Sequence, residues 1–143
     1  MKKRTSAMIN SFDGSTCGQT ATLRGYIQNI FNESGITAYY LEAGNKTNFP
    51  YITYSLRSID SFDDAGESRR YIMEINAWTD KNDMEIENIL DFLEGEFTGY
   101  TDVTDSFYIS IDPAYGRIDL NERTIKRKRV SFELKYWYKE CIN

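Results

Sequence analysis

The sequence contains no histidine, and its two cysteines, Cys17 and Cys141, lie near opposite ends of the chain. The absence of histidine excludes histidine-ligated metal sites, Ser-His-Asp and Cys-His nucleophiles, and a histidine general base. Two distant cysteines make no disulfide framework, and the composition suits a reducing compartment. The two residues are interpreted as free thiols, with a bridge between the termini or a single reactive thiol as the alternatives. Most common enzyme architectures are therefore excluded before any motif is considered.

Long hydrophobic runs are absent as well. No apolar stretch approaches the ~18 residues that a membrane span needs. The basic start at residues 1–4 is followed by a segment that is too short and polar for a signal peptide, so we expect a soluble, unexported protein. Aromatic residues are abundant instead, at 15% of 143 residues, which does not suit a disordered chain. We expect a polar N-terminal arm at 1–19 and a single domain with one core at 20–143.

The charged residues are segregated along the chain, although the net charge is only −5. Residues 60–105 include 14 acidic and 3 basic side chains, whereas residues 117–139 include 8 basic and 3 acidic ones. Such blocks form either solvated faces or separate patches of opposite sign. Patches of opposite sign are complementary head to tail, as a closed ring of identical subunits requires. This reasoning predicts that the acidic segment contacts the basic segment of a neighbouring subunit.

Two segments have the apolar spacing of amphipathic helices. The first is expected to begin at Thr20 or Thr22 as the N-cap and to end at Gly35. The second is expected to begin at Asn82, where Glu85 completes a capping-box pattern. The apolar stripes consist of Leu23, Tyr26, Ile27, Ile30 and Phe31 in the first helix and of Ile86, Ile89, Leu90, Leu93 and Phe97 in the second.

Alternating apolar and polar residues predict the strands. The predicted strands cover residues 37–41, 50–57, 70–79, 106–111, 117–120 and 125–138, and the last has the clearest alternation. The order of helix, strands, helix and strands indicates a single α+β domain. Its sheet is expected to be rich in antiparallel pairs, with the two main amphipathic helices packed on it.

The segment 60–68 is predicted to be an acidic hairpin loop or a longer excursion of the chain. Its carboxylates belong to Asp60, Asp63, Asp64 and Glu67. They are either solvated or able to offer oxygen ligands to a divalent cation. Residues 80–83 resemble the opening of an EF-hand loop, but Glu85 replaces the required glycine and Asp91 the required glutamate, so helix capping explains them better. We therefore predict no catalytic residue, no metal ligand and no cofactor.

A basic run lies on the way into the last strand, where alternate side chains point to opposite faces. It consists of Lys126, Arg127, Lys128 and Arg129. Three interpretations are open: an edge strand protected from aggregation, a site for an acidic protein surface, or a contact with nucleic acid, which the net acidity opposes. Tyrosines 39, 40, 51 and 54 are interpreted as sheet packing rather than as a platform for stacking bases.

Three segments carry a resemblance to a known family. Residues 49–54 (FPYITY) follow a helix and a short strand, residues 71–80 (YIMEINAWTD) lead into a helix, and residues 132–136 (FELKY) close the domain. Over roughly residues 20–139, this order resembles the small tail-terminator and tail-completion (tail-to-head joining) proteins of tailed bacteriophages and related phage-tail-like particles. Residues 1–19 are more polar than the family pattern suggests.

The resemblance implies a structural protein without an active site. It implies a hexameric ring that binds the tail tube protein at one side and head-completion or neck proteins at the other. The ring would assemble in the bacterial host cytoplasm and remain in the virion. The genome passes through its lumen without sequence-specific binding. The charge pattern makes Asp60, Asp63, Asp64, Glu67, Lys126, Arg127, Lys128 and Arg129 the candidate subunit or partner contacts. The alternative class is a small cytoplasmic enzyme or regulatory binding module that uses carboxylate chemistry.

Overall fold

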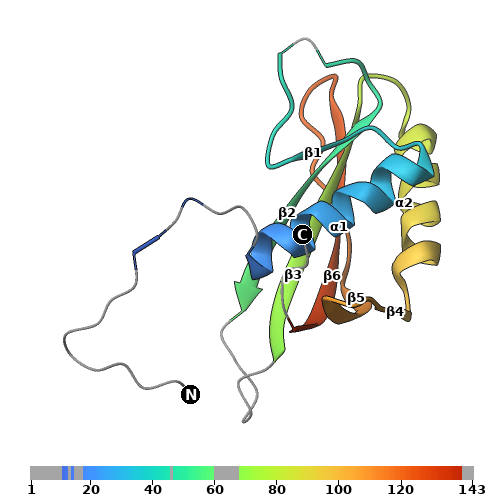
Figure 1. Cartoon of the computed structure of the whole chain (residues 1–143). Helices are drawn as coiled ribbons and strands as arrows, with labels where there is room; N and C mark the ends of the chain where they lie inside the picture. Colours follow the sequence, from blue (N-terminus) through green and yellow to red (C-terminus); the bar gives the residue numbers. More distant parts are fainter. Residues whose placement is uncertain (1–10, 13, 15–17, 46, 60–67, 140–143) are drawn as a thin grey trace.

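Two helices pack on one face of a six-stranded, mostly antiparallel sheet in the computed structural model, which describes residues 11–12, 14, 18–45, 47–59 and 68–139 (Figure 1). The elements are α1 (Gln19–Ser34), β1 (Ala38–Tyr40), β2 (Tyr51–Ile59), β3 (Ser68–Thr79), α2 (Asp83–Phe97), β4 (Tyr100–Val103), β5 (Phe107–Asp119) and β6 (Lys126–Tyr138). The predicted α+β class is confirmed.

The strand order explains where the basic run lies. The sheet has the order β1-β2-β3-β6-β5-β4, in which β1 and β2 are parallel and the other neighbours are antiparallel. Strand β6 therefore pairs with β3 on one side and with β5 on the other. The interpretation of residues 126–129 as a protected edge strand is wrong, because both sides of β6 are occupied.

Helix α1 has the predicted stripe but a different start. Its N-cap is Gly18, which has no side-chain capping hydrogen bond, so Thr20 and Thr22 both lie inside the helix rather than at its cap. The Thr20 hydroxyl instead lies 3.1 Å from the Tyr71 hydroxyl of β3. The predicted end is confirmed: Gly35 adopts a φ of 75°, a left-handed conformation that glycine accepts at little cost, and its N–H bonds back to Asn32.

Helix α2 begins at the predicted residue. The Asn82 side chain accepts a hydrogen bond from the Met84 N–H at 3.0 Å, as an N-cap should. The capping box is not completed in the predicted way, because the Glu85 carboxylate accepts a hydrogen bond from the Thr79 hydroxyl. Glu85 thereby ties the first turn of α2 to the end of β3.

The core lies between the helices and the sheet. Phe31 of α1 packs against Tyr54 of β2 and against Phe97 of α2, and Phe97 also packs against Phe132 of β6. All four side chains are at most 1% exposed. Aromatic side chains thus join both helices to the centre of the sheet, which holds α2 in a fixed position over β3, β5 and β6.

Two features of the second half of the sheet differ from the prediction. Strand β4 was not predicted, since its sequence YTDV has no clear alternation. Residues 106–111 and 117–120, predicted as two strands, belong largely to the single strand β5, whose register shifts between Pro113 and Tyr115 and again between Tyr115 and Ile118. Pro113 cannot donate to a ladder hydrogen bond, and such residues favour bulges.

Tyr136 gives a stability prediction. Its side chain is fully buried, and its hydroxyl has no hydrogen-bond partner among the described residues. Because an unsatisfied buried hydroxyl costs about 1–3 kcal/mol, Tyr136→Phe is expected to raise the free energy of unfolding by about 1 kcal/mol in urea titrations at pH 7. The matched control, Tyr71→Phe, loses the contact with Thr20 and should lower the free energy of unfolding.

The same substitution predicts a pH dependence. Burial raises the pKa of Tyr136 above its ordinary value of 10.0, so the folded state holds the proton more tightly than the unfolded state. The stability from this group is present below pH 10 and is lost as the pH rises further. The difference in the free energy of unfolding between Tyr136→Phe and the wild type should therefore grow above pH 10. A difference that shrinks above pH 10 would contradict this account.

Candidate functional site

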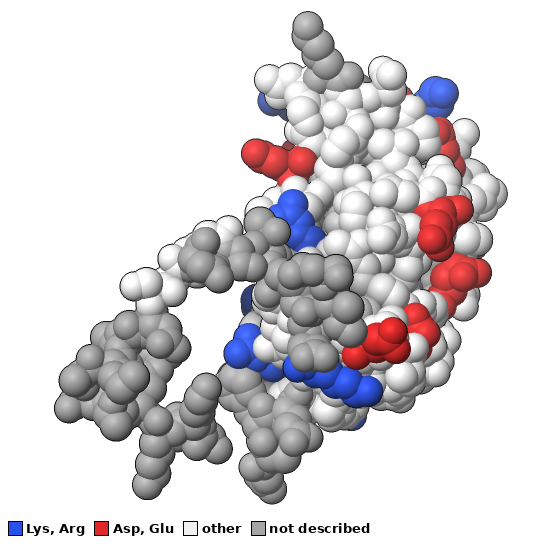
Figure 2. Space-filling view, viewed as in Figure 1, with Lys and Arg blue, Asp and Glu red and all other residues white. Residues whose placement is uncertain are grey.

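The outer side of α2 combines acidic charge with exposed apolar side chains. The helix has six acidic residues and no lysine or arginine: Asp83, Glu85, Glu87, Asp91, Glu94 and Glu96. Figure 2 shows acidic side chains along the side of the molecule formed by α2. Met84 is 62% and Phe92 45% exposed, and with Asn88 they are spaced four residues apart, so they form one line along the helix, here called the outer stripe.

A shallow groove runs beside the outer stripe. It lies between the C-terminal end of α1 and the middle of α2, has a volume of about 230 Å³, and is lined by Ser34, Ile36, Asn88, Ile89 and Phe92. A cavity of about 150 Å³ accommodates benzene, so the groove has room for an apolar side chain. The outer side of α2 is thus shaped for contact with an apolar group and charged for contact with a basic one.

Most of the acidic charge of α2 is used within the chain, in contacts with Lys128, Arg117 and the Thr79 hydroxyl. Lys128 of β6 has a side chain that is only 6% exposed, and its Nζ lies 2.5 Å from Asp119, 3.3 Å from Glu87 and 3.8 Å from Asp83. The hydrogen bond to Asp119 is the main cause that raises the pKa of Lys128 above its ordinary value of 10.5. Lys128 therefore remains charged at neutral pH and joins α2, β5 and β6.

Arg117 makes a second connection between the acidic and basic segments. Its guanidinium donates to Glu94 at 2.8 Å and also to Asp91, whose side chain remains 68% exposed. The segments 60–105 and 117–139 thus meet inside one subunit, through α2 and the strands β5 and β6. The predicted contact between subunits must depend on the charges that these internal pairs leave exposed.

The four residues of the basic run lie in different surroundings, and they alternate between the faces of β6 as predicted. Lys128 faces α2, whereas Arg127 and Arg129 lie on the opposite face of the sheet, on which neither described helix packs. Arg129 donates to the Asn76 side chain at 3.1 Å and lies 3.6 Å from the Glu74 carboxylate. Lys126 is half-buried at the start of the strand.

Arg127 belongs to a row of aromatic side chains. The sheet register places Tyr51, Trp78 and Arg127 side by side across β2, β3 and β6. Ring centroids lie 5.3 Å apart between Phe49 and Tyr51 and 6.1 Å apart between Tyr51 and Trp78, and both pairs are stacked. The Arg127 guanidinium lies 4.9 Å from the Trp78 ring centroid, within the range of a cation–π contact. These four residues are called the aromatic–arginine row.

Further bonds and contacts fix the aromatic–arginine row. The Trp78 indole N–H donates to the Thr53 hydroxyl at 3.0 Å, and the Tyr39 ring meets Tyr51 edge to face. Burial is the main cause that raises the pKa of Tyr51, so its phenol is neutral at physiological pH. The row is therefore a rigid, half-buried platform that ends in one positive charge.

A trio of oxygen-bearing side chains joins α1 to β4. The Tyr26 hydroxyl donates to the Asp102 carboxylate and lies within hydrogen-bond distance of the Tyr100 hydroxyl. Burial, followed by these hydrogen bonds, raises the pKa of Tyr26 well above its usual range. A phenol that holds its proton so tightly does not act as a base near neutral pH. The trio is a structural connection.

Several residues that the sequence analysis singled out lie in parts of the chain that the structure does not describe. Asp60, Asp63, Asp64 and Glu67, proposed as contacts or metal ligands, lie outside the described residues, as do Cys17 and Cys141. Within the described part of the chain, no three His, Cys, Asp or Glu side chains are grouped so that they could hold a metal ion. No described helix is long and apolar enough to cross a membrane.

The sequence reasoning missed the aromatic–arginine row as a unit. Tyr51 was assigned to sheet packing, which its stacking bears out, but Trp78 and Arg127 were not connected with it. The three residues come from strands far apart in the sequence, so no spacing pattern links them. A register prediction for β2, β3 and β6 is the signal that could have found them.

Comparisons with known proteins bear on the fold. No family model matches the chain, and no curated protein matches it. Seven chains among the solved structures match. One of them superimposes with a TM-score of 0.63 at 10% sequence identity, over 87% of this chain and 98% of that chain. At this level of identity the similarity shows a shared fold alone.

Proposed function

We propose that this protein is a tail terminator or tail-completion protein of a tailed bacteriophage or a phage-tail-like particle. In this role it forms a ring, a hexamer by the family resemblance, at the end of the tail tube and joins the tail to the head or neck. The role is structural rather than catalytic. DNA passes through the ring without its sequence being read.

One observation carries this proposal: the outer side of α2 is acidic and apolar, whereas the opposite side of the sheet presents arginine and aromatic residues. Unlike surfaces on opposite sides of a subunit favour head-to-tail association, which closes into a ring when the rotation permits. The resemblance adds support, because residues 49–54, 71–80 and 132–136 contribute to the adjacent strands β2, β3 and β6.

Genetic context and particle shape test the proposal. Genes for a tail tube and for head-completion proteins are expected on either side of the gene for this chain. Deletion of the gene from the phage or prophage should leave full heads beside unjoined or overlong tails in electron micrographs, and the intact gene supplied in trans should restore joined particles. Normal virions at normal titre without the gene would contradict the proposed function.

Ring assembly is expected to depend on salt. The ring should have a mass near six times 16.7 kDa by light scattering, alone or on the ends of tail tubes. Exposed charges are screened over about 10 Å at 0.1 M salt, and electrostatic attraction acts mainly on the association rate. Raising the salt should slow assembly several-fold while finished rings persist. An association rate that does not change with ionic strength would disprove the role of charge.

A further inference from the structure

Arg127 lacks the acidic partner that its neighbours Lys128 and Arg129 on β6 have within the described chain. Lys128, Arg117 and Arg129 each lie within 4 Å of a carboxylate of the same chain. Arg127 forms no ion pair within the described residues, and its Nε is buried without a hydrogen-bond acceptor there. Arg127 as a whole is only half-buried, and no described carboxylate neutralises its charge, so its guanidinium can pair with a carboxylate of a second molecule.

The side chains around Arg127 are those that carry the energy of protein interfaces. Trp, Tyr and Arg are the residues most enriched among interface hot spots, and the aromatic–arginine row contains one of each together with Phe49. Ring stacking, the cation–π contact and the hydrogen bond from Trp78 to Thr53 restrict the side chains of the row before any partner binds. A preorganised platform loses little side-chain entropy on binding.

We infer that the aromatic–arginine row of one subunit binds the outer stripe of α2 of a second copy of this chain. The inference rests on the proposed function and names the surfaces that meet in the ring. Met84 and Phe92 supply apolar side chains for the rings of Tyr51 and Trp78. Glu96, which is exposed, and Asp91, which stays 68% exposed beside Arg117, supply acceptors for Arg127.

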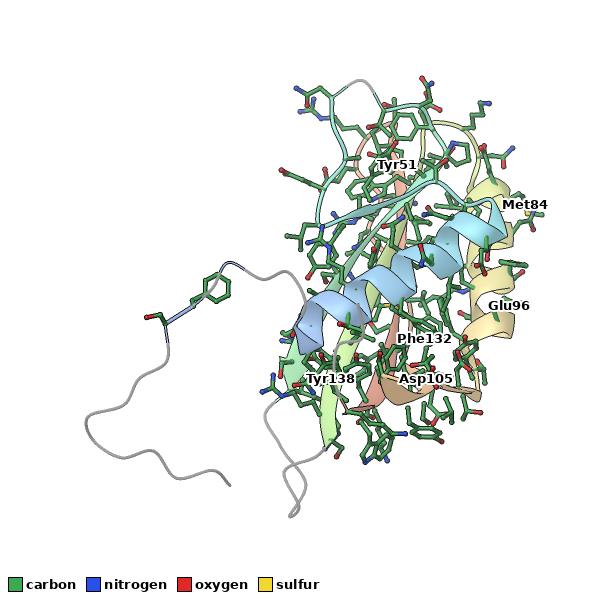
Figure 3. All side chains as sticks on the ribbon, in the orientation of Figure 1. Tyr51, Met84, Glu96, Asp105, Phe132 and Tyr138 are labelled. Carbon is green, nitrogen blue, oxygen red and sulfur yellow. The ribbon has the colours of Figure 1, made fainter. Side chains whose placement is uncertain are left out.

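The positions of the two surfaces fix the kind of contact. The aromatic–arginine row lies on the sheet face opposite the helices, whereas the outer stripe points away from the sheet on the helix side. In Figure 3, Tyr51 lies near one end of the sheet, and Met84 and Glu96 lie near opposite ends of α2. A subunit that uses its row therefore leaves its own stripe available for the next subunit, so the contact is heterologous and continues around a ring.

Two single variants separate the halves of the contact. Phe92→Ser damages the outer stripe and leaves the row intact, whereas Arg127→Glu damages the row and leaves the stripe intact. Each variant of the full chain is expected to reduce assembled species at least tenfold in sedimentation experiments. The matched controls are Val103→Ser, which also removes an exposed apolar side chain, and Arg123→Glu, which reverses an exposed arginine in the turn before β6. Both controls should assemble like the wild type.

Mixing the two variants gives the decisive result. A head-to-tail contact leaves one intact interface between a Phe92→Ser subunit, which contributes its row, and an Arg127→Glu subunit, which contributes its stripe. The mixture should therefore form a heterodimer with twice the mass of 16.7 kDa and grow no further. A mixture that remains monomeric would show that these surfaces do not bind each other.

The outcomes distinguish this inference from the proposed function. If rings form but either variant assembles like the wild type, the inference fails and the ring stands. If the wild type does not associate at any concentration, alone or with tail tubes, both fail. Should Arg127→Glu not fold, as judged by circular dichroism, Arg127→Gln replaces it, because the neutral side chain still lacks the charge that the carboxylates require. Assembly of a folded Arg127→Gln at the wild-type level would also overturn the inference.

Discussion

Phe97→Ala is expected to lower the free energy of unfolding by about 3–5 kcal/mol, the usual cost of removing a buried phenylalanine ring. The ring is fully buried where α1, α2 and the sheet meet, and it packs against Phe31, Phe132 and Tyr100. A domain of this size has a total stability of about 5–15 kcal/mol, so the loss is a large fraction of the whole. The substitution destabilises the packing of both helices, because Phe31 of α1 loses its contact with α2.

The matched control lies on the same helix. Phe92→Ala removes the same ring from an exposed position, where substitutions usually change stability by less than about 0.5 kcal/mol. Both variants should be measured by urea unfolding at a concentration low enough to keep the protein monomeric. A loss for Phe97→Ala no larger than that for Phe92→Ala would mean that α2 does not depend on this aromatic contact.

The elements that the sequence predicted well are those with a strong internal period. The apolar stripes of α1 and α2 recur every three to four residues, and the alternation in β3 and β6 places Met73, Ile75, Phe132 and Leu134 in the core. Such periodic patterns depend only on residues close together in the chain. Helices and strands with such patterns can therefore be predicted without knowing which strand pairs with which.

What the sequence could not predict depends on pairing between distant segments. The central place of β6 and the bulged course of β5 past Pro113 follow from the ladders that form around them. Strand β4 is defined by its pairing with β5 rather than by its own four residues. The charges illustrate the same limit: their segregation was visible, but Lys128 and Arg117 find acidic partners within the subunit.

Lys128→Met is expected to lower the free energy of unfolding by about 2 kcal/mol. Removing one partner of a buried ion pair costs about 3–5 kcal/mol, and the effect should be smaller here because Asp83, Glu87 and Asp119 are 41–65% exposed and are screened by water. Methionine preserves most of the buried stem, so the change isolates the charge. The control Lys135→Met lies on the same strand at an exposed position and should change stability by less than about 0.5 kcal/mol.

Two further measurements identify the cause of this loss. Adding Glu87→Gln and Asp119→Asn to Lys128→Met removes the two carboxylates nearest to Nζ, leaves only the more distant Asp83, and should recover much of the lost stability. The pKa of Lys128 is raised in the folded state, so its contribution is complete below pH 10.5 and is lost as the pH rises through the folded value. The difference between wild type and Lys128→Met should therefore shrink in strongly alkaline solution.

The same variant separates the two uses of the basic run. Lys128 is buried against α2 of its own subunit, whereas Arg127 lies on the opposite face without an acidic partner in the described chain. Lys128→Met should therefore reduce stability while folded subunits still assemble, and Arg127→Glu should block assembly while the subunit stays folded. If Lys128→Met instead abolished assembly at full stability, the contact between subunits would have to include the α2 side of β6.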